Sequence, residues 1–469
     1  MSASINLQNF GSCLQAMQDN KRPTVIIMGT GELARSFANT MGAQNALNFV
    51  VFGQNLNKAK SVVQDILHGA AALPNYPLHD PLQPEKVAPP GPILKEVLEN
   101  KNSGSKSRLD DGRAKGYQAS LLYNVFHDKQ GNPISDAEYS ANKDSVAKPV
   151  VAMAISDKNM LKELMSSADM VYYTLGKSEK RALAEKGPKG LVRREQLQEN
   201  LEILAENAEP ISYAKKAIHV ITPNPDNLIA RAYGEMTGLE PMRVLTVGSL
   251  VDSLRLKNVL AEEVGGSMDD IPRAWVLGEH GPKMTVAWNH ASIGEQPAEK
   301  FLHKLVKNNL ESSSGLVPSE TDIQKTLGQF KERLQQEAVR VAPYILLSTR
   351  SGTEIGPVAA AVKVAKTILM ANREEDMVCG FAQKGHQGEP VLGMPVRLQT
   401  GMVTELEVSL SDDVKKQLAE SARELNAEFQ RPEVQGIIAP VRDRIAIKHK
   451  YNIDPPASAN ANKSGPSAV

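Results

Sequence analysis

Two short segments carry side chains that together can move a proton and hold an anion. His280 lies in the run Gly278–Gly281, and Asp252 and Arg255 precede it in the chain. Asp252 and Arg255 are three positions apart, so in a helix both side chains project from one face. An imidazole, a carboxylate that orients it and a guanidinium are the groups needed to protonate a 2-oxo acid while its carboxylate is held.

Size and composition set limits on the class of protein. A chain of 469 residues with 41% hydrophobic residues is long enough for two globular domains and further segments. Lys+Arg and Asp+Glu number 54 each, and the resulting net charge of zero argues against a nucleic-acid or membrane-surface partner. Cys13 and Cys379 are the only cysteines, which favours a reducing compartment. With no signal pattern and no long apolar run, we expect a cytoplasmic protein.

A nucleotide-binding pattern lies near the N-terminus. The apolar strand 24–28 is followed by Gly29-x-Gly31-x-x-Ala34, which opens a helix predicted over 32–41. A second strand over 49–52 and a helix over 56–67 complete a β-α-β unit. Glycines at such a turn let the backbone approach a pyrophosphate at the positive end of the helix. We therefore expect a dinucleotide site formed by Gly29, Thr30, Gly31, Glu32 and Leu33; the alternative is a tight turn without a ligand.

The position that usually selects the adenosine ribose is unusual. An acidic residue is expected at the end of the second strand, but Gly53 and Gln54 stand there. The absence of a carboxylate removes repulsion of a 2′-phosphate, and Lys58 and Lys60 follow. The cofactor is therefore predicted to be NAD or NADP, unless both lysines only solvate a helix face.

Alternating strands and helices predict the fold class. Strands over 149–155, 170–174 and 218–222 alternate with helices over 157–167 and 193–208. This order favours an α/β fold, a Rossmann-type doubly wound parallel sheet followed by an α+β catalytic domain. That second part is predicted to contain helices over 253–264, 298–310, 320–345, 357–372 and 411–430, the last one in the chain, and β segments over 273–277, 284–288, 376–382 and 402–410.

Composition changes suggest domain boundaries. We expect a helix-compatible N-terminal extension (1–20), a dinucleotide-binding domain (21–240), a substrate domain (241–453) and a disordered tail (454–469). Residues 70–149 are rich in Pro, Gly, Ser, Asn and Lys and are interpreted as an insertion. Within it, 121–127 and the segment after Gly131-Asn132 are predicted to form a hairpin.

Several ordered motifs resemble those of the lactate/malate dehydrogenase family. They are Asp65-Ile66-Leu67-His68-Gly69, Ile221-Thr222-Pro223-Asn224-Pro225-Asp226, Val251-Asp252-Ser253-x-Arg255, Gly278-Glu279-His280-Gly281, Gly393-Met394-Pro395-Val396 and Leu410-Ser411-Asp412. The likeness covers most of 24–69 and 149–430. It implies an NAD(P)-dependent 2-hydroxyacid dehydrogenase that assembles as a homodimer or homotetramer.

The resemblance also implies roles for single residues. His280 would be the general acid/base with a near-neutral pKa, and Asp252 would orient its ring. Substrate binding would fall to Arg255, to the mobile-loop residue Arg193, to Asn224 and to Thr353, whose register is uncertain. Further cofactor contacts are expected from Thr174, Gly176, Asn200, Thr222 and Asn224. No metal site is predicted, because no cluster has ligand spacing.

Departures from the family pattern keep alternatives open. The loop between Gly176 and Arg193 is longer than usual and rich in Lys and Arg, Gly187 stands where a specificity residue is expected, and Pro282 follows the histidine motif. The basic loop favours malate/oxaloacetate over lactate-type or other 2-oxo acid specificity. A second hypothesis is a dehydrogenase scaffold that serves as a binding or regulatory protein. Taken singly, His280 could be a buried structural imidazole and Asp252–Arg255 an ordinary helix ion pair.

Overall fold

The computed structural model describes residues 5–8, 17, 22–42, 47–72, 120–123, 126–127, 133–134, 151–177, 193–281, 283–314, 316–349, 355–370, 373–383 and 389–451. The predicted tail and most of the predicted insertion lie outside these residues. The chain divides into two compact units, Met1–Tyr172 and Tyr173–Val469. The division into a dinucleotide domain and a substrate domain near residue 240 stays a prediction about function.

The first unit contains the predicted parallel strands. β2 (Thr24–Met28) pairs in parallel with β3 (Asn48–Phe52), and β3 pairs in parallel with β7 (Val151–Ile155). β8 (Met170–Tyr173) lies beside β2 in the sheet order. Every residue of these strands is buried, as expected for a parallel sheet with covered faces. The helices are α2 (Glu32–Gly42), α3 (Leu56–Ala72) and α6 (Lys158–Met165).

The predicted hairpin within the insertion is confirmed in part. β5 (Phe126–His127) pairs with β6 (Pro133–Ile134) in antiparallel orientation. β4 (Ser120–Tyr123) belongs to the main sheet instead, because it pairs antiparallel with β1 (Ile5–Gln8) and β7. The prediction of a helix-compatible N-terminus is wrong at β1, where pairing with a distant strand overrides local preference.

The second unit contains a mixed sheet. β9 (Ile218–Ile221) and β10 (Val244–Thr246) are parallel, and β15 (Glu374–Ala382), β16 (Val391–Gln399) and β17 (Met402–Glu405) continue the sheet in antiparallel fashion. The second unit also contains four helices: α8 (Arg193–Ile211), α9 (Asp226–Thr237), α10 (Gly248–Val264) and α13 (Ile355–Leu369). The two units together confirm the predicted α/β class with an α+β second part.

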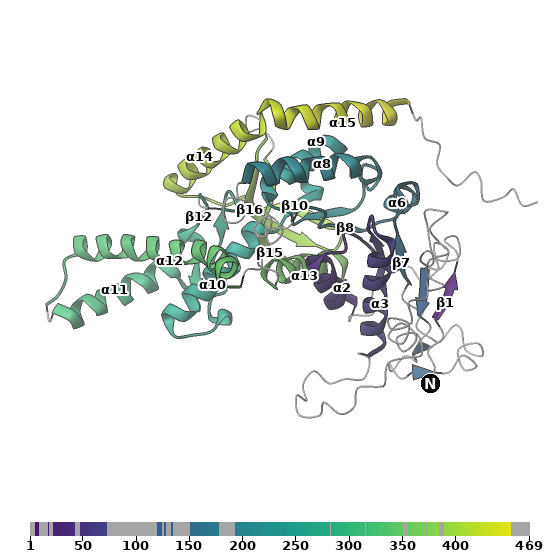
Figure 1. The fold of residues 1–469 in the computed structure, drawn as a ribbon. Coiled ribbons are helices and arrows are strands. Elements are labelled where there is room, and N and C mark those ends of the chain that lie inside the picture. Colours follow the sequence, from purple (N-terminus) through teal and green to yellow (C-terminus); the bar gives the residue numbers. More distant parts are fainter. Residues whose placement is uncertain are drawn as a thin grey trace, which may run out of the picture. The chain divides into compact units, whose positions relative to one another are not determined.

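Two long helices, α11 (Ala298–Ser314) and α12 (Glu320–Thr349), form a helical layer beside α10. The two helices lie against each other and α12 lies against α10 (Figure 1). Their apolar side chains, such as Leu302 and Leu334, share one core with Leu256 and Ile271. Short elements complete this region: β11 (Val276–Leu277), β12 (Thr285–Val286), β13 (Ser292–Ile293), β14 (Gln296–Pro297) and the 3-10 turns Pro241–Arg243, Met268–Asp270 and Trp288–His290.

The end of the described chain is more helical than predicted. α14 (Asp412–Phe429) matches expectation, but a further helix, α15 (Pro432–Tyr451), follows it and packs on α8 and α9 (Figure 1). The prediction that the helix over 411–430 is the last one is therefore wrong. Its buried residues Val434, Ile438, Val441 and Ile445 follow a helical spacing that the internal Pro440 obscured.

His219 is a buried residue of the second unit whose two ring nitrogens both have hydrogen-bond partners. Its Nδ1 is 2.8 Å from the Tyr233 hydroxyl and its Nε2 is 2.9 Å from the Ala214 carbonyl oxygen. Burial lowers the pKa of His219 to about 4, although the Ala214 carbonyl opposes that shift. The folded state therefore favours the neutral form of the His219 imidazole.

The second unit should lose stability on acidification because of His219. The unfolded state, with an ordinary histidine pKa, takes up a proton before the folded state does, so the free energy of unfolding falls as the pH drops from about 6.5 toward 4. A His219→Asn variant should be less stable at pH 7, and its free energy of unfolding should fall by about 1 kcal/mol less per pH unit in that window. Urea unfolding at pH 7 and pH 5 measures both slopes; equal slopes would contradict the assignment.

Candidate active site

The backbone of His280 is fixed from two sides. Gly278 and Gly393 exchange two backbone hydrogen bonds of 2.9 and 2.8 Å, which tie the end of β11 to β16. The Asn227 side chain accepts a hydrogen bond from the His280 backbone N–H at 3.0 Å and donates one to the Val391 carbonyl, also at 3.0 Å. The imidazole therefore projects from a backbone held between α9 and the sheet.

One carboxylate holds both of the predicted functional side chains. Asp252 Oδ2 is 2.6 Å from His280 Nδ1, and Asp252 Oδ1 accepts from Arg255 Nη1 at 2.9 Å. Both α10 residues lie on one helix face, as the three-residue spacing predicts. Asp252 is only 3% exposed, so its charge needs both partners. Among the described residues, Asp252 is the hydrogen-bond and ion-pair partner of the Arg255 guanidinium.

The protonation state of His280 differs from the sequence-based expectation. Burial alone would lower the pKa of the imidazole, but the charge and hydrogen bond of Asp252, together with the charge of Asp226, raise it to about 9. Arg255 opposes this rise. The expectation of a near-neutral pKa took no account of two carboxylates around one ring. The raised pKa favours the imidazolium, in which Nδ1 donates to Asp252 and Nε2 carries the second proton.

A glycine lies between the imidazole and Asp226. Gly248 is the first residue of α10, and its backbone N–H donates to Asp226 Oδ2 at 3.1 Å. A Cβ at Gly248 would overlap Asp226 Oδ2 and the Cβ and Cγ of His280. Any side chain here would displace one of the two groups, so the close approach requires glycine.

The Asn200 side chain links the segment after β8 to the segment after β9, both of which carry residues predicted to contact the cofactor. Its Oδ1 accepts from the Lys177 backbone N–H at 2.7 Å and its Nδ2 donates to the Asn224 carbonyl at 2.8 Å. A Cβ at Gly176 would come tightly against the same amide and against Pro223, so little space is left for a side chain there. The buried Asn200 therefore holds two loops rather than presenting its amide to solvent.

The other predicted residues of the second unit have different surroundings. Thr222 donates from N and Oγ1 to the Tyr173 carbonyl, at 3.2 and 3.1 Å, and Thr174 and Asn224 are half-buried. Lys177, the first basic residue of the long loop, forms an ion pair with Glu199 at 2.9 Å. Arg193 begins α8, but its side chain lies outside the described residues, as do Thr353 and Pro282.

The glycine turn of the first unit connects β2 to α2 through a glycine with positive φ. Gly29 has φ +131°, a conformation that side chains rarely adopt, and its N–H donates to the Phe52 carbonyl at 2.9 Å. A Cβ at Gly31 would meet nothing within 4 Å, so packing within the chain does not demand glycine there. The turn opens α2 at Glu32, with Thr30 and Leu33 half-buried beside it.

The surroundings of Gly53 in the first unit leave little space for a side chain at this position. A Cβ at this position would overlap the methyl group of Thr30, and the Gly53 N–H donates to the Ile155 carbonyl at 3.1 Å. No acidic side chain fits at this position while Thr30 keeps its rotamer. Gln54 beside it is exposed.

His280 borders a pocket of about 630 Å³ in the second unit. Its walls come from α8, α9 and the residue before it, the histidine loop, α14 and the turn between α14 and α15: Leu197, Pro225, Asn227, Leu228, Glu279, His280, Glu424, Leu425, Ala427, Glu428 and Arg431. Arg255 does not line it. Arg431 pairs with Glu428 at 2.7 Å, so the rim has both signs of charge.

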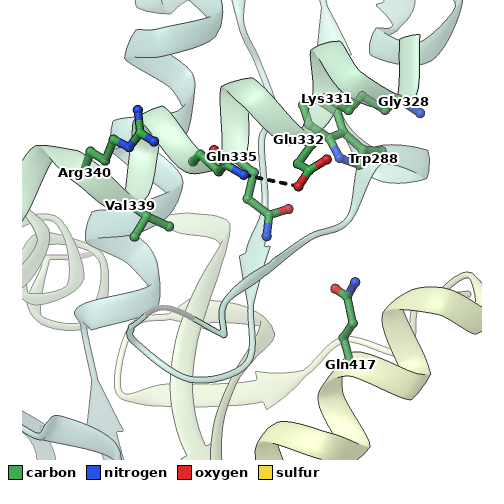
Figure 2. A pocket seen from close by; sticks show the side chains of 9 residues that line it. Trp288, Gly328, Lys331, Glu332, Gln335, Val339, Arg340 and Gln417 are labelled. Atoms are coloured by element: carbon green, nitrogen blue, oxygen red, sulfur yellow. Dashed lines mark hydrogen bonds between the residues drawn. The ribbon is translucent and has the colours of Figure 1, made fainter. Parts of the chain in front are cut away.

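A second pocket, of about 530 Å³, is lined mainly by α12. Figure 2 shows Lys331 and Glu332 near Trp288, Arg340 farther along the same helix, and Gln417 of α14 across the opening. This pocket contains none of the predicted site residues. In the part of the chain that the structure describes, no group of His, Cys, Asp and Glu has the arrangement of a metal site. No described helix is long and apolar enough to span a bilayer.

Sequence reasoning missed three residues around the imidazole: Asp226, Asn227 and Gly248. Asp226 was noted only as part of a motif, and the helix α9 that it begins was not predicted. A signal was present, because Asp226 and Asn227 follow Asn224-Pro225 at the end of a buried strand, where site residues collect in such sheets. No sequence pattern marks Gly248, because the residues close to it in space, Asp226 and His280, are distant in the sequence.

Comparison with known proteins identifies similar chains. Residues 250–433 match the family model of the lactate/malate dehydrogenase α/β C-terminal domain. Malate dehydrogenase 2 of Aquifex aeolicus is 31% identical over 277 residues, 57% of this chain and 72% of that protein. The L-lactate dehydrogenase of Mycoplasma pneumoniae is 28% identical over 260 residues, 55% of this chain and 74% of its own.

Solved structures share the fold. The malate dehydrogenase of Plasmodium falciparum superposes with a TM-score of 0.59 at 14% identity and covers 89% of this chain and 99% of its own. The lactate dehydrogenase of Cryptosporidium parvum, complexed with lactic acid and nicotinamide adenine dinucleotide, gives 0.59 at 18% identity and covers 89% and 98%. At these identities the likeness establishes the fold alone.

Gly248→Ala should disrupt the arrangement around the imidazole. The added methyl group overlaps Asp226 and His280, so we expect a destabilisation of about 1–3 kcal/mol and an altered His280 ring signal in NMR spectra. Gly234→Ala is the matched control, because Gly234 lies in α9 with nothing within 4 Å of its Cβ position and should be neutral or stabilising. Equal effects of the two substitutions on stability and on the ring signal would contradict the close approach.

Proposed function

Because the chain belongs to the lactate/malate dehydrogenase family, we propose that it is a nicotinamide-dependent oxidoreductase that interconverts a 2-oxo acid and the corresponding 2-hydroxy acid. The observation that supports this most directly is the 2.6 Å hydrogen bond between His280 Nδ1 and Asp252 Oδ2, with Arg255 on the same carboxylate.

His280 is the proposed general acid in the reductive direction. With Nδ1 hydrogen-bonded to Asp252, the imidazolium directs the proton on Nε2 toward the substrate keto oxygen. As the oxygen accepts that proton, the ring becomes neutral and Asp252 keeps it in one orientation. In the oxidative direction neutral His280 removes the hydroxyl proton, and Asp252 stabilises the imidazolium that forms.

Arg255 is the proposed anchor for the substrate carboxylate. Its planar guanidinium has five N–H donors, of which Asp252 engages one nitrogen, so donors remain for a two-point contact. The ion pair to Asp252 then fixes the distance between anion anchor and imidazole. Family resemblance assigns Arg193 and Asn224 to the substrate as well, and Thr353 to the pocket.

The residues of the first unit fit a dinucleotide. Gly29 in its positive-φ conformation, open space at Gly31 and the N-terminus of α2 are suited to a pyrophosphate, with Thr30, Glu32 and Leu33 alongside. When bound, the nicotinamide supplies or accepts the hydride. Contacts from Thr174, Gly176, Asn200 and Thr222 are proposed by resemblance. The absence of an acid at Gly53 and Gln54 is compatible with NAD and NADP, and one related structure contains NADH.

We propose oxaloacetate/malate as the preferred pair, with lactate-type or another 2-oxo acid specificity as the alternative. The basic residues between Gly176 and Arg193 and the higher identity to a malate dehydrogenase support it. Lys177 contributes less, because Glu199 already neutralises it. Family membership also favours a homodimer or homotetramer. A cytoplasmic location rests on the sequence argument alone.

Replacing His280 with Asn should reduce the rate of reduction of a 2-oxo acid by about 10²–10⁴-fold, because the amide cannot transfer a proton. The decrease in nicotinamide absorbance at saturating substrate gives kcat for the purified protein. His303→Asn is the control, since His303 pairs with the exposed Glu320 on the helical layer and should leave kcat unchanged. Undiminished turnover in the His280 variant would remove it as the acid/base.

A single set of steady-state assays should resolve substrate and cofactor. Oxaloacetate and pyruvate, each with NADH and NADPH, are compared by kcat/KM, and oxaloacetate is expected to give the larger value. A larger value for pyruvate would establish lactate-type specificity instead. Calorimetric titration with both cofactors accompanies the assay, because failure to bind either would favour a scaffold that serves as a binding or regulatory protein.

A further inference from the structure

We propose that Asp226 is a positioning residue for the acid–base step: a second buried carboxylate that, beside Asp252, stabilises the protonated imidazole of His280. This inference rests on the proposed function and identifies a residue that neither the sequence motifs nor the family comparison assign to the reaction. It acts through His280 rather than on the substrate.

The geometry around Gly248 brings Asp226 to the imidazole. Asp226 Oδ2 accepts from the Gly248 N–H at 3.1 Å, and the same glycine faces the Cβ and Cγ of His280. Carboxylate and ring therefore lie within the roughly 4–6 Å over which an opposite charge favours the charged form of a group. Asp252 binds Nδ1, so the ring has one carboxylate as a hydrogen-bond acceptor and a second as a neighbouring charge.

Asp226 is also an unusual residue to bury for structural reasons alone. It is 2% exposed, and hydrogen bonding from the Gly248 N–H, the Thr246 side chain and the Asn227 backbone favours its charged form against the cost of burial. A serine or an asparagine could accept from the Gly248 N–H without the cost of burying a charge. Burial raises the pKa of Asp226 and the charge of His280 opposes that rise, so each group stabilises the charged form of the other.

The other charged groups around His280 are more exposed or already paired. Arg255 on α10 opposes protonation of the ring, but it shares its charge with Asp252. Glu279 is the neighbouring residue, and the pocket rim carries Glu424, Glu428 and Arg431. Of these, Glu424 pairs with Lys283 and Glu428 with Arg431. Asp252 and Asp226 are thus the two carboxylates buried beside the ring.

The consequence for the reaction is a bias in direction. A ring that keeps its proton above neutral pH is ready to protonate a 2-oxo acid, whereas oxidation of the hydroxy acid first requires loss of that proton. Reduction should therefore proceed over the neutral range and oxidation should require alkaline pH. Removal of the Asp226 charge should lower both the pH above which reduction declines and the pH above which oxidation begins.

The direct test is an NMR titration of the His280 ring in the full chain without substrate. Selective ¹³C labelling of histidine gives the ring signals, and the signal missing in His280→Asn identifies His280. In Asp226→Asn, which keeps an acceptor for Gly248, the titration midpoint should fall by about one pH unit or more. Glu235→Gln is the matched control, because Glu235 is a carboxylate of the same helix that pairs with Arg231, and the midpoint should not move.

An unchanged midpoint in folded Asp226→Asn would overturn the proposal, and so would an equal shift in Glu235→Gln. Asp226→Ser provides a second neutral variant, with a side chain favoured at helix N-termini, should the first variant not fold. This measurement does not need turnover, so its failure is separate from a failure of the proposed function.

Kinetics give a second readout that a purely structural role would not change. The pH limit above which kcat/KM for reduction declines should move to lower pH in Asp226→Asn by the same interval as the ring titration. A lower kcat with the same pH limit would assign Asp226 to packing alone. Absence of reductase activity in the wild-type chain would refute the proposed function while the NMR result still decides the role of Asp226.

Discussion

The arrangement depends on one carboxylate that has two partners. Asp252 is buried on α10, and its two oxygens bind the His280 ring and the Arg255 guanidinium at 2.6 and 2.9 Å. A buried carboxylate without partners would be costly, and the hydrogen bonds from the His280 ring and the Arg255 guanidinium offset that cost. The same pairing sets the ring tautomer and the position of the guanidinium, which couples a stability requirement to the proposed chemistry.

The surrounding backbone makes this charge arrangement rigid. Asn227 holds the His280 backbone and the β16 edge together, and Gly278 and Gly393 join the histidine loop to the sheet. Gly248 lets α10 begin directly against the ring and Asp226. Three elements that are far apart in sequence, α9, α10 and β16, therefore converge on one imidazole. A small displacement of any of them would alter the distances on which proton transfer depends.

Two departures from expectation have physical explanations. A Cβ at Gly53, where the family pattern has an acid, would overlap the methyl group of Thr30 in its present rotamer. The additional helix α15 packs on α8 and α9, the helices that carry Asn200 and Asp226, so it adds apolar support behind residues near the site. Neither departure removes a group that the proposed acid–base step requires.

The sequence alone determined the α/β class, most strand positions and the Asp252, Arg255 and His280 set, because local periodicity and short motifs encode them. It also gave the glycine turn that opens α2. It did not give β1, α15, the neighbourhood of Gly248 or the role proposed for Asp226. These depend on contacts between distant segments, and the pKa of His280 depends on how many carboxylates the fold brings to it. Burial and charge proximity are properties of the folded chain, so only the tertiary structure decided them.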